Sequence, residues 1–241
     1  MTDFNLANPH DYDHQHSSSA GTGWLRASVF GAMDGLVSNI GLITGIAAAG
    51  ASAGIIAITG ISGLISGAVS MALGEYTSVR TQNEQLEVEV ETERRALERN
   101  PTGEEAELAE MFTHLGMEPA TATAAASQVH ASTEQALKVH LAHELGLSTD
   151  ERPSPMVAAG SSLIAFSVGA IIPVLPFLFG FGTLWWGLAF GAVGLVLAGY
   201  LAAKFTGRSP LAGAGRQLLF GGVAVVTTYS IGMLLGVSSF A

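Results

Sequence analysis

A single carboxylate stands inside a long apolar stretch of this chain. Asp34 is the only charged residue between Ala27 and Gly74, and it lies in the segment FGAMDGLVSNIGLITG at positions 30–45. A carboxylate at the centre of a membrane-spanning helix costs at least about 2.5 kcal/mol, so such residues face a cavity or a partner and typically mark an ion path. The alternative is a protonated side chain bonded to a neighbouring helix. Because a carboxylate binds either a proton or a metal ion, Asp34 is a candidate for cation exchange against protons.

Two residues of the next apolar stretch are expected near the same depth as Asp34. Asp34 follows Arg26 by eight residues, about 12 Å along a helix. Met71 precedes Arg80 by nine residues, so an antiparallel helix brings it to nearly the same level, with Glu75 one turn nearer the charged end. A carboxylate with a thioether suits Fe(II) better than magnesium or calcium. Core packing is the alternative for Met71, and snorkelling to the membrane surface is the alternative for Glu75.

A second group of candidate ligands lies in a strongly acidic segment. Residues 81–151 carry fifteen acidic and four basic side chains. Like charges three or four residues apart weaken an isolated helix, so their repetition favours a divalent cation held between several helices. Solvated helix faces are the alternative. The side chains at this spacing are Glu89 with Glu93, Glu104 with Glu107 and Glu110, and His140 with Glu144.

The ends and the composition limit what else can bind metal. The chain has no cysteine, so any metal must be held by oxygen, imidazole or thioether groups. The segment HDYDHQH at positions 10–16 offers further ligands, but low complexity near a terminus indicates disorder. We therefore expect residues 1–23 to form a disordered tail that contains His and Asp, with a metal contact there as an open alternative.

The elements that must position these residues are membrane-spanning helices. The chain is 49% hydrophobic and 12% charged, against about a quarter charged in soluble domains. A helix needs about 20 apolar residues to cross a bilayer. Gly-rich turns at 47–54 and 179–183 divide two of the three apolar stretches, which gives five spans. We expect them at Trp24 to Ala48, Ile55 to Val79, Val157 to Phe179, Leu184 to Ala203 and Gln217 to Val237.

The basic residues predict how these five helices are oriented. All ten Lys and Arg lie at the N-terminal end of the first span, between the second and third spans, or between the fourth and fifth. Lys and Arg are retained on the cytoplasmic side, so we expect the N-terminus in the cytosol and the C-terminus outside. In IIPVLPFLF, Pro173 and Pro176 are expected to kink the third span.

The acidic segment is expected to be a helical domain in the cytosol. No helix breaker occurs between Glu75 and Asn100, so the second span should continue as a stem until Pro101. TGEE then has the spacing of a capping box, with Thr102 as the N-cap. Three short helices should follow. The first ends near 115, the second starts near 119, and the third runs from about 133 to 145. The expected division is 1–23 tail, 24–80 helices 1 and 2, 81–152 cytoplasmic metal-binding domain, and 153–241 helices 3 to 5.

Several segments resemble the vacuolar iron transporter (VIT) family in order and spacing, over about residues 24–237. They are GAMDGLVSNIGLITG, SGAVSMALGEYTSVRTQNE, HELGL and GAIIPVLPFLF. The resemblance is to a prokaryotic-type member, and it implies a homodimer of five-helix subunits with the path at their interface. It also implies export of Fe(II), with Mn(II) or other divalent transition metals as further substrates, in exchange for protons. By position, the family's contacts in the membrane fall on Asp34 and Met71, with Glu75 nearby.

The resemblance also implies a ligand set in the cytoplasmic domain. Its ligands fall on Glu93, Glu104, Glu107 and Glu144. Two positions depart from the pattern of the plant members: Ala96 replaces a glutamate of the stem, and His140 replaces a methionine. His140 can itself ligate a metal, and Glu89 or Glu110 could replace the missing carboxylate.

These observations predict an all-helical, multi-pass membrane transporter that exports Fe(II) in exchange for protons. We expect the protein not to be an enzyme and to have no prosthetic group. The host would be the inner cell membrane in a prokaryote or a vacuolar-type membrane in a eukaryote. We expect divalent metal ions, protons, the bilayer and a second copy as partners, and no nucleic acid. One alternative is a membrane-anchored iron-binding or ferroxidase-like protein, although the paired Glu-x-x-His motifs of di-iron sites are absent. A structural or signalling membrane protein without metal is another.

Overall fold

The computed structural model describes residues 19–144 and 152–238, so the HDYDHQH segment and the end of the HELGL motif lie outside the described residues. All regular structure in the described ranges is helical, as the sequence predicts. The helices are α1 (Ser19–Ala48), α2 (Ala53–Arg99), α3 (Pro101–His114), α4 (Pro119–His130), α5 (Thr133–Glu144), α6 (Pro155–Ile171), α7 (Leu175–Leu178), α8 (Leu184–Phe205) and α9 (Pro210–Ser238).

Four of these helices, α1, α2, α8 and α9, are long and apolar enough to cross a membrane. The expected third span differs from the prediction, because α6 has 17 residues and ends at Ile171 instead of continuing to Phe179. Pro173 has no N–H to donate, and its ring collides with the preceding turn of a helix. A turn at 172–174 therefore separates α6 from the short α7, so the expected kink is a break in the helix.

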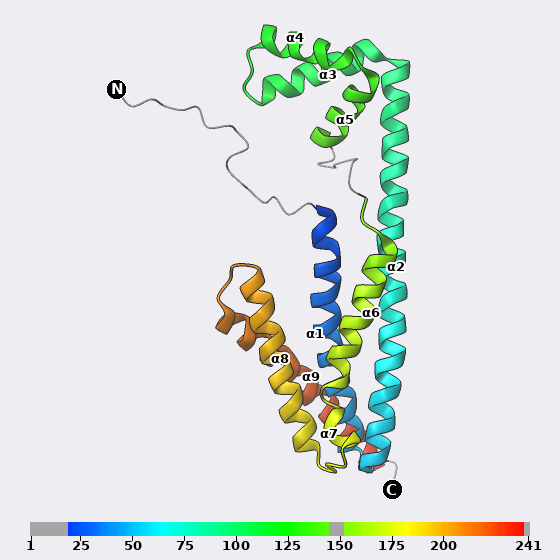
Figure 1. Ribbon diagram of the computed structural model, residues 1–241, viewed down its shortest axis with the longest axis vertical. Helices are drawn as coiled ribbons and strands as arrows, with labels where there is room; N and C mark the ends of the chain where they lie inside the picture. Colours follow the sequence, from blue (N-terminus) through cyan, green and yellow to red (C-terminus); the bar gives the residue numbers. More distant parts are fainter. Residues whose placement is uncertain (1–18, 145–151, 239–241) are drawn as a thin grey trace, which may run out of the picture.

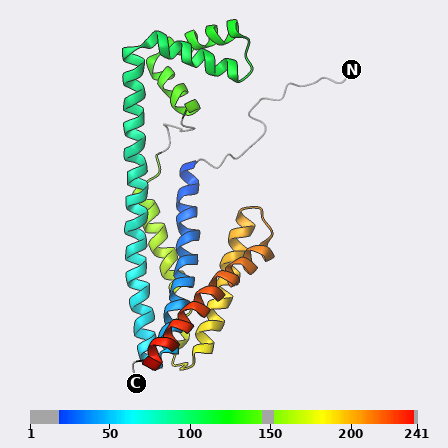
Figure 2. The same ribbon diagram turned by 180° about the vertical axis from the view of Figure 1, so that it is seen from behind.

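Helix α1 lies at the centre of the apolar part of the molecule and contacts α2, α6, α8 and α9. Figures 1 and 2 show α6 beside α1 and α2, with α8 and α9 along the other side of α1. Glycines bring α1 and α6 together backbone to backbone: a Cβ at Gly35 would collide with the carbonyl of Phe166, and one at Gly169 with that of Ala32. Such close approach is the usual way in which membrane helices pack.

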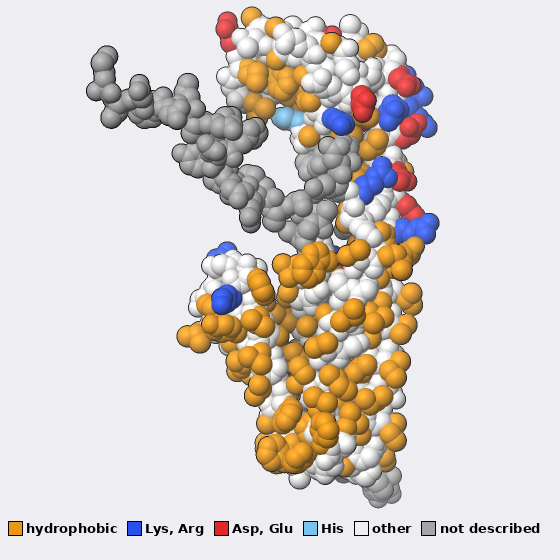
Figure 3. Space-filling model, in the orientation of Figure 1, with side chains coloured by type: hydrophobic (Ala, Val, Ile, Leu, Met, Phe, Trp, Pro, Cys, Tyr) orange, Lys and Arg blue, Asp and Glu red, His pale blue; other side chains and the backbone are white. Residues whose placement is uncertain are grey.

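Helix α2 continues beyond the apolar part as the predicted stem. Its 47 residues correspond to about 70 Å, and α3, α4 and α5 gather at its far end (Figure 1). Figure 3 shows hydrophobic side chains covering the lower part of the molecule and charged ones along the upper stem. Leu97 of the stem packs with Leu137 and Leu141 of α5, so the helical domain has a small core of its own.

The start of α3 corrects one prediction. The N-cap is Asn100, whose side chain accepts a hydrogen bond from the backbone N–H of Gly103 at 3.2 Å. Thr102, the cap expected from the sequence, lies inside the first turn. The reason is that Pro101 is favoured at the first helical position, which makes the residue before it the cap.

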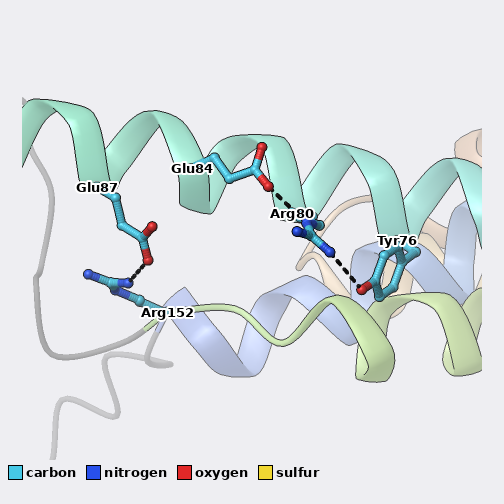
Figure 4. A network of polar contacts seen from close by, with 5 residues as sticks. All are labelled: Tyr76, Arg80, Glu84, Glu87 and Arg152. Atoms are coloured by element: carbon cyan, nitrogen blue, oxygen red, sulfur yellow. Dashed lines mark hydrogen bonds and ion pairs between the residues drawn. The ribbon is translucent and has the colours of Figure 1, made fainter.

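Polar contacts join the stem to the chain that leads into α6 (Figure 4). Arg80 contacts Glu84 at 2.8 Å and the hydroxyl of Tyr76 at 3.5 Å, all on the stem. Arg152, just before α6, pairs with Glu87 of the stem, 65 residues away in sequence. Exposed pairs of this kind contribute little stability, so this contact shows where the returning chain lies beside α2 without holding it there.

Candidate metal sites in the membrane part and in the helical domain

Asp34, Met71 and Glu75, the three residues predicted inside the membrane, line one cavity of about 420 Å³ between α1 and α2. All three side chains are half-buried. The cavity opens on the molecular surface beside Phe30, which is exposed. The structure therefore brings together the carboxylates and the thioether that the depth argument paired.

Glycines of α2 keep this cavity open. Gly63, Gly67 and Gly74 all line it, and a Cβ at Gly74 would meet no atom within 4 Å. On the side toward α6, the ring of Phe166 fits against Gly67, where any Cβ would collide with it. The space between the two helices is thus closed on one side by the ring of Phe166 and left empty beside Gly74.

Arg26 stands beside Glu75 at the end of the cavity nearest the charged stem. Its guanidinium lies 3.4 Å from the Glu75 carboxylate. The Arg26 side chain is 65% exposed and that of Glu75 only 11%, so Glu75 is turned into the protein. A cation that reached Glu75 would compete with this guanidinium for the same carboxylate.

A second cluster lies where α3 and α5 meet the stem. Glu93 of α2, Glu104 of α3 and His140 of α5 offer ligand atoms that all lie within 4.8 Å of one another. His140 is fully buried, and its Nδ1 is 3.2 Å from Oε1 of Glu93. It is buried because Leu137 and Leu141, on the same face of α5, pack against the stem.

Two carboxylates and one imidazole suit Fe(II), Mn(II) and other divalent transition metals better than calcium, which prefers oxygen alone. With His140 bound to a metal through Nδ1, the ion would take the place of the proton between that nitrogen and Glu93. The cluster therefore has the composition of a site for one divalent cation, drawn from three helices.

His130, at the end of α4, is a residue that the sequence analysis did not include. Its Nε2 is 3.1 Å from Nε2 of His140, and the two rings meet edge to face at 78°. Partial burial lowers the pKa of His130 below its usual 6.5, helped by the charge of His140 and opposed by Glu105. A neutral His130 can accept the Nε2 proton of His140. Helical spacing could not reveal the pair, because the two histidines lie on different helices.

The other carboxylates proposed from spacing lie outside this cluster. Glu89, Glu107 and Glu110 are exposed, and Glu110 stands 3.7 Å from the exposed His114. Glu144 is the last residue of α5, and its side chain is not among those described. Ala96, where the resemblance implies a glutamate, is half-buried one turn beyond Glu93. The sequence analysis grouped these candidate ligands into three sets by helical spacing. The structure brings together one residue from each set, namely Glu93, Glu104 and His140.

Comparison with known proteins gives matches along nearly the whole chain. The model of the VIT family matches residues 25–233. A protein of Acanthamoeba castellanii, "Vacuolar iron transporter", is 35% identical over 227 residues, which cover 91% of this chain and 82% of that protein. "Vacuolar iron transporter homolog 3" of Arabidopsis thaliana is 30% identical over 239 residues, covering 96% and 93%. "Vacuolar iron transporter 1" of the same plant is 28% identical over 213 residues, covering 86% and 84%.

Proposed function

Because the chain belongs to the VIT family, we propose that it exports Fe(II) from the cytosol across its membrane in exchange for protons, with Mn(II) as a further substrate. It is a multi-pass membrane protein of a transporter family and not an enzyme. The relatives named above are called iron transporters, which supports a metal ion as the transported substrate.

One observation carries the proposal: Asp34 and Met71 face the same cavity, with Glu75 at its charged end. A borderline cation would find carboxylate and thioether ligands there, and the Asp34 carboxylate could take up a proton when the cation leaves. Glu75, once released from Arg26, would be the first carboxylate that the cation meets. The cavity therefore contains the groups that proton-coupled exchange requires.

We place the N-terminus in the cytosol and count α6 with α7 as a fifth crossing. This choice is supported by the positions of the ten Lys and Arg. Arg26 lies near the start of α1, six lie from Arg80 to Arg152, and three lie from Lys204 to Arg216. The host would be a prokaryotic inner membrane or a eukaryotic vacuolar-type membrane. A homodimer is part of the proposal, because a second copy could cover the open side of the cavity.

The cluster of Glu93, Glu104 and His140 would collect the cation in the cytosol before transport. His130 would act on His140 as a positioning residue. Histidines that bind metal usually donate their second N–H to a partner, which fixes the tautomer and the ring orientation. Here the acceptor would be Nε2 of His130, 3.1 Å away.

The test is Fe(II) uptake by proteoliposomes with an acidic interior, under a reductant that keeps the iron divalent. We expect uptake by the wild type that stops when the pH gradient is dissipated, and no uptake by Asp34→Ala. Glu110→Ala, an exposed carboxylate outside both sites, is the matched control and should transport like the wild type. Equal uptake by the wild type and Asp34→Ala would remove the proposed role of Asp34. Metal binding without any uptake would favour an iron-binding protein that does not transport.

A further inference from the structure

A second cavity lies where the apolar part of the molecule meets the charged stem. It is formed by the start of α1, the part of α2 around residues 79–82, and the chain that leads into α6. Its volume is about 460 Å³, within the range of about 300 to 1,000 Å³ that is usual for ligand sites. It shares no lining residue with the cavity of Asp34, so it is a separate candidate site.

This second cavity is basic, although the chain as a whole has a formal net charge of −10. Arg26 and Arg152 both line it, and none of the described residues in its lining is acidic. Trp24, Gln82 and Ser154 add further groups that can donate hydrogen bonds. Two guanidinium groups among neutral donors favour a bound anion.

Both arginines have N–H groups beyond those that contact carboxylates of the protein. One Nη of Arg26 contacts Glu75 at 3.4 Å, and one Nη of Arg152 contacts Glu87 (Figure 4). A guanidinium carries five N–H donors in a planar fork that matches the oxygens of a phosphate. The two side chains are 65% and 46% exposed, so each can turn toward a ligand without leaving a packed core.

The position of the cavity along the helices corresponds to the surface of the bilayer. Asn83 of the stem donates a hydrogen bond to the carbonyl of Pro153 at 3.0 Å, so the neighbouring Arg152 lies beside α2 where the charged residues begin. Trp24 is 49% exposed, and tryptophan is enriched at the level of the lipid headgroups. A ligand in this cavity would therefore lie at headgroup depth.

An exposed apolar face of α6 continues from the cavity into the membrane part. Val157 lines the cavity, and Ile164 and Val168 follow it by seven and eleven residues, which places all three on one side of the helix. All three side chains are more than half exposed. An acyl chain along this face would bring the phosphate of its headgroup to the two arginines.

We propose that this cavity binds the phosphate of an anionic phospholipid, in the leaflet on the side of the helical domain, through Arg26 and Arg152. Basic pockets between membrane helices recognise anionic headgroups in this way. Free phosphate offers the same charge but nothing that would lie along Val157 and Ile164. The inference does not depend on the transport function, because its test measures bound lipid and not metal.

The test is native mass spectrometry of the full-length protein in detergent, titrated with phosphatidylglycerol or with phosphatidylcholine. We expect one phosphatidylglycerol per chain to be retained in preference to phosphatidylcholine. Arg26→Gln combined with Arg152→Gln should weaken its binding at least about tenfold, since hydrogen bonds to charged groups typically contribute this factor or more. The matched control is Lys204→Gln combined with Arg208→Gln, which removes two exposed positive charges outside the cavity and should bind like the wild type.

Three outcomes would overturn the proposal. Equal weakening in both double variants would show attraction by net charge alone. Equal retention of phosphatidylcholine by the wild type would show that the anionic headgroup is not recognised. Inorganic phosphate in large excess should leave the lipid bound, and complete displacement would assign the cavity to free phosphate.

If the double variant of Arg26 and Arg152 does not elute as a folded protein, Arg152→Gln alone decides. This substitution leaves Arg26 and its contact with Glu75 in place. It should bind phosphatidylglycerol more weakly than the double variant of Lys204 and Arg208, although it removes one positive charge fewer. Binding equal to that control would overturn the proposal.

Discussion

Replacing His130 by alanine should weaken metal binding at the cluster of Glu93, Glu104 and His140 without removing any of its three ligands. His140 is fully buried, with Nδ1 toward Glu93 and Nε2 toward His130. A metal on Nδ1 leaves the imidazole proton on Nε2, where His130 accepts it. Without His130, that buried N–H loses its partner, and the ring can also turn away from the carboxylates.

The size of the effect follows from the burial of the two rings. Loss of a hydrogen-bond partner of a metal-binding histidine typically weakens metal affinity by about 10- to 100-fold, or about 1.4 to 2.7 kcal/mol. His130 is only half-buried, so water that enters the space left by its ring can replace part of the bond. We therefore expect about tenfold weaker binding for His130→Ala, the lower end of that range. His130→Gln, which supplies another acceptor, should recover part of the loss.

The assay is titration of the full-length protein with Mn(II), which resists oxidation, followed by the EPR signal of the free ion. Every sample carries Asp34→Ala and Glu75→Ala, so that the membrane cavity contributes no carboxylate of its own. His114→Ala is the matched control, because His114 is 79% exposed and lies outside the cluster. Unchanged affinity in His130→Ala, together with loss of binding in His140→Ala, would refute the positioning role of His130.

Three further predictions test the helical domain. Glu104→Gln should weaken Mn(II) binding in the same titration and Glu107→Gln should not, because only Glu104 lies in the cluster; equal effects would contradict the assigned ligands. Leu108→Ala should lower the free energy of unfolding by about 2 to 5 kcal/mol, since Leu108 is fully buried, and loss of helical circular dichroism in denaturant would measure it. Asn100→Ala should lower the free energy of unfolding by about 1 kcal/mol in the same experiment, because Asn100 is the N-cap of α3. A larger loss of unfolding free energy for Thr102→Ala than for Asn100→Ala would show that Thr102 is the N-cap, as expected from the sequence.

Much of the fold followed from one-dimensional patterns. The apolar stretches, the Gly-rich turns and the unbroken stem are properties of consecutive residues, and α1, α2, α8 and α9 appear close to where those patterns placed them. Helix ends were harder to predict where neighbouring residues favour different ends. Pro101 and Thr102 both offered a way to start α3, and the stronger preference of proline for the first helical position decided it. Pro173 similarly ended α6 where a kink was expected.

For the metal sites, helical spacing selected the right types of residue but too many of them. Spacing places Glu104, Glu107 and Glu110 on one face of α3, yet only Glu104 reaches the cluster, and the other two are exposed to solvent. His130 could not be found in this way, since ten residues and a turn separate it from His140.

The sequence by itself determined that this chain is a helical membrane protein with a buried carboxylate, a thioether on the next helix and an acidic domain on a stem. Hydrophobicity and charge act residue by residue, so they can be read along the chain. Only the tertiary structure decided which side chains meet: Arg26 and Arg152 at one cavity, and Glu93, Glu104 and His140 from three helices. Those contacts depend on how helices cross and how closely their backbones approach, and packing sets both.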